Sequence, residues 1–280
     1  MNEIVYTPKS ALTRPGEFLR AMFRDLHSSH GLARELMTRD IKALYRQSLL
    51  GYAWALIPPI LAALGMVMAR DANIVNIVET PLPYPAYVAF STALWQTFVE
   101  SVAGPIAALG AARPLMARIN FPREALFMAK IGEILFNFMI KLALITGLFL
   151  VYDMPVTWHA FLAPLGLASL IIFGTFTGLV LAPISVLFED VKKGLIFLTS
   201  AWMLLTPVIY PQPSQGFMAV LVRYNPVTPL LNTTRELATT GQVADWTGFI
   251  TATVIGTVGL FVFWMVFRMA TPYLTERISA

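Results

Sequence analysis

Six long apolar runs constrain the fold of this chain more than any other feature of its sequence. They lie at about residues 49–70, 84–108, 123–151, 159–187, 195–210 and 246–268. A helix needs roughly 20 apolar residues to cross the hydrocarbon core of a bilayer. Only 13% of the residues are charged, against about 25% in soluble domains. The pattern predicts an all-α membrane protein with six transmembrane helices and no large soluble domain.

The first 48 residues differ from the rest, because charged side chains recur there at short intervals. We expect a first amphipathic helix from Pro15 and a second over residues 32–48, separated at Gly31. Three basic side chains share one face of the second helix: Arg39, Lys42 and Arg46. Amphipathic helices of this kind lie in the headgroup plane of a membrane. The sequence therefore predicts two interface helices before the first span.

The distribution of Lys and Arg predicts the orientation in the membrane. With the N terminus inside, fifteen of these residues fall on the cytoplasmic side and three outside. Cytoplasmic loops normally carry such an excess, so we expect both termini in the cytoplasm. Three units follow: residues 1–48 as arm and interface helices, 49–270 as the transmembrane domain, and 271–280 as a cytoplasmic tail.

One segment fits neither a span nor a hydrated loop. Residues 211–245 lie between the fifth and sixth runs, yet 216–222 and 227–237 are largely apolar. Pro226 and Pro229 stand where short helices can begin. A segment as apolar as this is stable at membrane depth when it packs on protein or lines a cavity. We therefore expect two short re-entrant helices between spans 5 and 6.

Composition excludes several classes of function. The net charge is +4, but the basic residues lie in loops and membrane-proximal helices, which favours contact with anionic lipid and argues against nucleic acid. The chain has no cysteine and three scattered histidines, so we expect no disulfide, no metal site and no thiol chemistry.

The third apolar run carries a polar stripe on one helical face, formed by Lys130, Glu133, Asn137 and Lys141. Charges at mid-depth cost about 2.5–3.5 kcal/mol each, so such a stripe faces protein or water. One interpretation is a Lys130–Glu133 pair that ties the helices together, and the other is a hydrophilic channel lining. We expect Lys141 to reach the outer interface and Glu100, in the second run, to be a structural partner.

Aromatic residues are frequent near the predicted ends of the spans. An interfacial belt accounts for most of them. Sugars also stack on aromatic rings, and Trp202 and Tyr210 are our aromatic candidates for a channel lining, beside Lys130, Glu133 and Asn137.

Several motifs occur in order along the chain. They read RDIKALYRQSLLGYAWA at 39–55, NFPRE at 120–124, FEDV at 188–191 with TPVIY at 206–210, and YNPVTPL at 224–230 followed by Arg235-Glu236. From about residue 32 onward the chain resembles the membrane subunit of bacterial ABC exporters for polysaccharides. This is the ABC-2 permease group, which handles O antigen, capsule and teichoic acid.

The resemblance implies a homodimer in the bacterial plasma (inner) membrane that encloses a translocation channel, with two copies of a separate ATPase on its cytoplasmic side. The substrate would be a lipid-linked polysaccharide. The chain has no G-x-x-x-x-G-K-[ST] phosphate loop, so ATP and magnesium would be bound by the partner and the permease itself needs no cofactor. Our candidates for ATPase docking are Glu189, Asp190 and Val191, together with Arg39, Lys42 and Arg46.

Three other functions compete with this one. A related ABC-2 permease could export a small lipid or a drug. A membrane-embedded glycan-modifying enzyme would need grouped acidic or histidine residues, whereas those on the outer side are spread over separate loops, so we expect no catalytic residue. An ion-coupled carrier would show inverted repeats with broken helices, and the two halves of the chain do not correspond.

Overall fold

The computed structural model describes residues 15–46, 48–74, 80–116, 121–154 and 156–279, and these residues form helices and connecting turns without a β-strand. The α-helices are α2 (Pro15–Ser28), α3 (His30–Arg46), α4 (Ile57–Asp71), α5 (Tyr84–Met116), α6 (Glu124–Val151), α7 (Ala163–Leu187), α8 (Asp190–Leu204), α9 (Phe217–Tyr224), α10 (Val227–Ala238) and α11 (Trp246–Ser279). Short 3-10 helices, η1 (Gly51–Ala55) and η2 (Trp158–Leu162), precede α4 and α7. The all-α prediction is confirmed.

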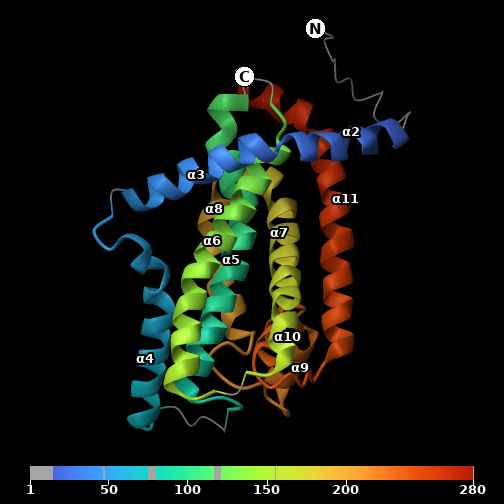
Figure 1. Ribbon diagram of the computed structural model, residues 1–280. Helices are drawn as coiled ribbons and strands as arrows, with labels where there is room; N and C mark the ends of the chain where they lie inside the picture. Colours follow the sequence, from blue (N-terminus) through green and yellow to red (C-terminus); the bar gives the residue numbers. More distant parts are fainter. Residues whose placement is uncertain (1–14, 47, 75–79, 117–120, 155, 280) are drawn as a thin grey trace.

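The helices form a bundle with one helix pair lying across its end (Figure 1). Helices α4 to α8 and α11 run alongside one another, and consecutive members alternate in direction. Helices α2 and α3 cross one end nearly at right angles, and α9 and α10 lie at the opposite end. We call these the α3 end and the α10 end.

Three helical segments are long and apolar enough to cross a bilayer among the residues described. They are Glu124–Val151, Trp158–Leu187 and Trp246–Ala270, and they correspond to the third, fourth and sixth predicted spans. The other predicted spans appear as α5, with 33 residues, and as α4 and α8, with 15 residues each.

Several predicted helix ends are displaced. The first span was expected from residue 49, but α4 begins at Ile57 because prolines occupy its first turn, and η1 precedes it. The fifth was expected over 195–210, but α8 begins at Asp190 and ends at Leu204. The break between α2 and α3 falls at Ser29, two residues before Gly31. There the Ser29 hydroxyl donates to the Asp25 carbonyl oxygen over 2.5 Å, and such local bonds compete with the regular helix.

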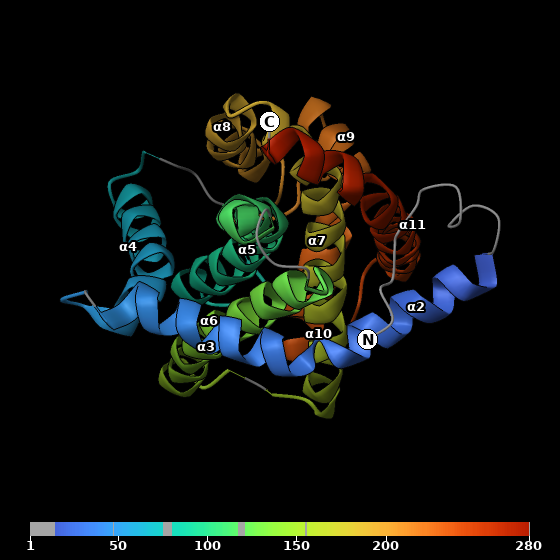
Figure 2. The same cartoon turned by 90° about the horizontal axis from the view of Figure 1, so that it is seen from above.

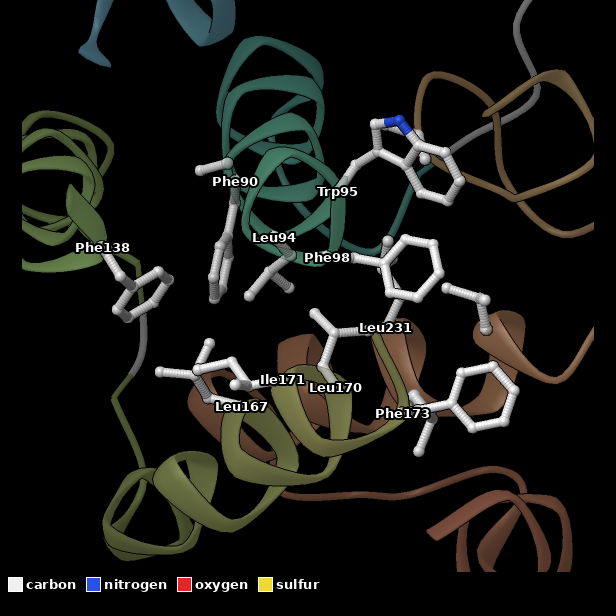
Figure 3. Packing of buried hydrophobic residues seen from close by; sticks show 14 of the residues in the cluster. Phe90, Leu94, Trp95, Phe98, Phe138, Leu167, Leu170, Ile171, Phe173 and Leu231 are labelled. Atoms are coloured by element: carbon white, nitrogen blue, oxygen red, sulfur yellow. The ribbon is translucent and has the colours of Figure 1, made fainter. Parts of the chain in front are cut away.

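The core lies between α5, α7 and α10, with α6 on its flank (Figure 3). Figure 3 shows aromatic and branched side chains from these helices converging, among them Phe98, Leu170 and Leu231. Glycine lets α5 and α7 approach closely: a Cβ on Gly178 would lie 2.2 Å from the Val102 carbonyl oxygen. Small residues at helix contacts are typical of membrane proteins, where close packing replaces the hydrophobic driving force.

Candidate functional site

One polar face of α6 carries three of the channel candidates and is covered by α3. Lys130 Nζ lies 2.6 Å from a carboxylate oxygen of Glu133 and 3.2 Å from one of Asp40, on α3. Further along α6, the Tyr45 hydroxyl of α3 donates to Asn137 Oδ1 over 2.8 Å. The predicted Lys130–Glu133 pair is confirmed. The same stripe is also the contact that holds α3 against the bundle.

Asp40 is the charged centre of this contact. Its Oδ1 accepts hydrogen bonds from Arg39 Nη2 and Nε over 2.8 and 3.0 Å. Burial by itself raises the pKa of Asp40, but hydrogen bonds from Arg39 and Lys130 hold the pKa below its usual value. The carboxylate is therefore ionised at neutral pH and attracts both cations.

A second ion pair lies deeper in the bundle and corrects the expectation for Lys141. We expected this side chain to extend to the outer interface, but it is fully buried. Its Nζ lies 2.5 Å from Glu100 Oε1 on α5, with the Thr97 hydroxyl at 3.5 Å. The Glu100 carboxylate, whose side chain is 32% exposed, pairs with the ammonium inside the bundle, so extension to the outer interface is unnecessary. The expectation that Glu100 is a structural partner is confirmed.

The basic docking candidates lie together on the exposed face of α3. Arg39, Lys42 and Arg46 are exposed, and they line a shallow groove along the helix with Arg34 and Glu35. Among the described ion pairs, none includes Arg34, Lys42 or Arg46. The fourth cation of this face, Arg39, pairs with Asp40 of its own helix. This face is therefore available to a partner or to lipid.

The acidic docking candidates lie elsewhere at the same end. Glu189 precedes the first residue of α8, Asp190, and both are exposed, while Val191 is half-buried. Seen from above, α3 and α8 lie on opposite sides of the bundle, with α5, α6 and α7 between them (Figure 2). The structure thus forms two separate surfaces from the six predicted residues.

At the α10 end, two tyrosines of α5 bind the irregular segment that follows α8. The Tyr84 hydroxyl donates to the Ile209 carbonyl oxygen over 3.0 Å. The Tyr87 hydroxyl lies 3.2 Å from the carbonyl oxygen of Pro207 and 2.9 Å from that of Tyr210. These carbonyls have left the helix, and side-chain donors satisfy them in place of backbone amides.

Asn225 joins the same segment to the start of α10. Its Nδ2 donates to the Leu205 carbonyl oxygen and the Thr206 hydroxyl over 3.0 and 2.8 Å. Its Oδ1 accepts from Trp202 Nε1 over 3.0 Å and from the Val227 amide over 3.1 Å. The motifs at 206–210 and 224–230 therefore meet around one amide side chain.

The aromatic channel candidates are held by contacts of their own. Trp202 is half-buried and packs edge-on against Phe98, with ring centroids 5.3 Å apart. The Tyr210 hydroxyl donates to the Leu204 carbonyl oxygen over 2.7 Å. A small, mostly apolar groove opens beside them between α8 and α9. Its lining residues are Trp202, Leu205, Val220, Leu221, Tyr224, Asn225 and Pro226.

Arg235 was quoted in a motif but given no role from sequence, and it is the most enclosed cation of the α10 end, only 6% exposed. Its guanidinium donates to the Ser91 hydroxyl over 2.7 Å and to Asn232 Oδ1 over 2.9 Å. It also lies 4.1 Å from the centroid of the Tyr87 ring. None of the ion pairs within the described residues includes it. The clue in the sequence was an arginine in an otherwise apolar segment.

The described residues contain no group of three or more His, Asp or Glu side chains that could hold a metal ion. What the chain offers is charged surface at the α3 end and an aromatic, hydrogen-bonded end around α10.

Most of the chain matches one protein family. The profile of a family described as "ABC-2 type transporter" matches residues 32–239. An O-antigen export system permease protein of Myxococcus xanthus is 28% identical over 214 residues, which cover 75% of this chain and 81% of that protein. A protein of the same name from Klebsiella pneumoniae is 23% identical over 235 residues, covering 79% of this chain and 87% of the relative.

Proposed function

Since the chain belongs to the ABC-2 type transporter family, we propose that it is the transmembrane subunit of an ABC transporter that exports a lipid-linked polysaccharide. O antigen or a capsule-like glycan is the proposed cargo, and the bacterial plasma membrane is the proposed site. The observation that carries the proposal is the similarity over residues 32–239 together with the relatives' names. This range holds both surfaces at the α3 end and the whole Asn225 network.

The proposed topology has six crossings, α4 to α8 and α11, with both termini in the cytoplasm. Two observations support it: these helices alternate in direction (Figure 1), and lysine and arginine are concentrated on the side of the α3 end. Helices α9 and α10 would then re-enter from outside. Phe217 and Tyr224 of α9 are 76% and 82% exposed, which favours a lipid or channel environment for this helix over water.

Two copies of the permease would form the channel, and two copies of a separate ATPase would bind ATP and magnesium. The exposed Glu189, Asp190 turn and the basic face of α3 are the proposed docking surfaces. An amphipathic helix tied to α6 through Asp40 and Tyr45 is well placed to pass movement of a docked partner into a spanning helix. The link is direct because Lys130 and Asn137 belong to α6 itself.

The channel lining is proposed from the half-buried polar and aromatic side chains. Lys130, Glu133 and Asn137 keep one edge accessible beside α3, and Trp202 borders the groove near α9. Sugars can hydrogen-bond through their hydroxyls to the polar side chains and stack on the ring of Trp202. Because α3 and α8 lie on opposite sides of the bundle (Figure 2), the two sets would line different sides of one copy.

Deletion of the gene in its host tests the cargo. We expect surface glycan to disappear and lipid-linked glycan to accumulate inside, with both effects reversed by the intact gene. Normal surface glycan would contradict the proposal. Changed sensitivity to drugs with normal glycan would instead favour the alternative, an ABC-2 exporter of a drug or small lipid.

A further inference from the structure

Helix α2 precedes the family match, which begins at residue 32, and it is fastened to a helix that follows the match. Arg268 of α11 pairs with Asp25 of α2 and, over 2.7 Å, with Glu124 of α6. Its guanidinium also lies 5.7 Å from the centroid of the Phe18 ring. The two regions outside the match thus hold each other in place at the α3 end.

A second contact sets the depth of α2 relative to α11. The Phe23 ring meets Trp264 edge-on, with centroids 5.9 Å apart, yet Phe23 remains 53% exposed. Trp264 and Arg268 are near the end of the apolar segment Trp246–Ala270. Tryptophan and arginine at this position are typical of the membrane–water interface. Helix α2 therefore lies at the level of the headgroups.

The position of α2 beside an apolar flank of α11 favours lipid as its surroundings. Helix α11 is at the edge of the bundle, and the first turns of α2 extend beyond it (Figures 1 and 2). One flank of α11 carries aliphatic side chains that are all more than 40% exposed: Val254, Ile255, Val258, Val262 and Val266. The space beside this flank suits acyl chains, so α2 extends over a bilayer surface.

The two faces of α2 fit that surface. Met22 is fully buried against the bundle, and Phe23 lies next to it at the border of the exposed face. Arg20 and Arg24, four residues apart on the opposite face, are exposed. A helix with an apolar side chain at the edge of one face and arginines on the exposed face is typical of helices that lie in an anionic membrane surface.

We propose that α2 is a lipid-binding helix whose Arg20 and Arg24 bind anionic phospholipid headgroups while Phe23 enters the acyl boundary. The partner is the lipid of the leaflet at the α3 end. This inference does not depend on the exported cargo, so its failure would leave the proposed function standing.

The chain has no cysteine, so Gly16→Cys creates a single labelling site on α2. A side chain there meets no other atom within 4 Å. The labelled full-length permease, in nanodiscs of phosphatidylcholine with increasing phosphatidylglycerol, is exposed to a quencher attached to the lipid headgroup. We expect quenching to rise with the phosphatidylglycerol fraction.

Neutralising the arginines is the decisive step. Each basic residue near an anionic surface contributes about fivefold in affinity. The double variant R20Q and R24Q should therefore need a higher phosphatidylglycerol fraction than the parent to reach the same quenching. The matched variant R70Q and R223Q, which removes two exposed arginines at the α10 end, should titrate like the parent. Elution as a single species checks that both variants fold.

Three results would overturn the inference. They are a label that stays in water at every lipid composition, an R20Q and R24Q variant that titrates like its parent, and shielding that appears only when an ATPase or a second permease copy is added. The last result would mean that α2 binds a protein and not lipid.

Discussion

The α3 end and the α10 end of the bundle are joined by different chemistry. At the α3 end, ion pairs connect the helices, and additional charges remain exposed on α3 and beside α8. At the α10 end, Tyr84, Tyr87 and Asn225 bind backbone carbonyls and hydroxyls, and the enclosed Arg235 has only neutral partners. The ion pairs that join helices at the α3 end have side chains that are 9–22% exposed, while the remaining cations of α3 are open to solvent and screened by salt. The buried hydrogen bonds of the α10 end are costly to break. We infer that the α3 end is suited to reversible docking and the α10 end to a fixed geometry.

The largest loss of stability should follow Arg235→Ala. The change removes the donor to the Ser91 hydroxyl and to Asn232 Oδ1 and opens a cavity beside Tyr87, so we expect the free energy of unfolding to fall by about 2–4 kcal/mol. Unfolding in mixed micelles measures this value. Arg235→Lys is the matched control and should lose less, since it keeps the charge. A loss below about 1 kcal/mol in the alanine variant would mean that the α10 end does not depend on this residue.

Asn225→Asp tests the neutral network without changing the volume of the side chain. The carboxylate cannot donate to the Leu205 carbonyl oxygen or to Thr206 as the amide does, and we expect a loss of about 2 kcal/mol. The same unfolding measurement, repeated in high salt, should give nearly the same loss. An unchanged stability would remove Asn225 from the contacts that hold this end.

Asp40→Asn tests the α3 end in the same assay. Its side chain is 22% exposed and that of its partner Lys130 is 19% exposed, so we expect a loss of about 1 kcal/mol, between the values for exposed and for buried pairs. The loss should shrink in 1 M salt, where the screening length is about 3 Å. A loss equal to that of Asn225→Asp, or one that salt does not reduce, would erase the difference between the two ends.

The pH dependence of the Asp40 contact has a definite sign. Because the pKa of Asp40 is lowered in the folded protein, its contribution is complete above the unfolded value of about 3.9 and is lost as the pH falls through the folded value. Asp40→Asn should therefore approach the parent in stability only at acidic pH. A difference that persists at low pH would contradict this assignment.

The smallest effect on stability should follow reversal of two charges, Glu189→Lys and Asp190→Lys. Both side chains are exposed, and surface changes usually stay within about 0.5 kcal/mol. We expect the bundle to remain intact while co-purification of the ATPase weakens. Reversal of Arg39 and Lys42 to Glu probes the other proposed surface. Normal co-purification of the partner with the first variant would argue against docking at the α7–α8 turn.

Much of the fold could be predicted because membrane helices are encoded locally. Hydropathy located the helices of the bundle and Pro226 marked the start of α10, whereas the prolines that set the start of α4 were missed. The partner of Lys141 could not be predicted, since Glu100 lies 41 residues away on another helix and only packing brings them together. The burial of Arg235 was missed for the same reason.

The motifs could be recognised as a set, but their contacts could not. Sequence spacing gave the polar face of α6 but not α3 as the element that covers it. The six docking candidates form two surfaces because α3 and α8 are separated by the bundle, a relation that no local pattern carries.

Transport in proteoliposomes tests the central claim most directly. The permease is reconstituted with and without the proposed partner ATPase, and lipid-linked glycan that becomes accessible on the far side is measured after ATP is added. We predict ATP-dependent transfer and ATP hydrolysis only when both proteins are present. ATP hydrolysis by the permease alone, or no transfer of the glycan by the complete pair, would contradict the account.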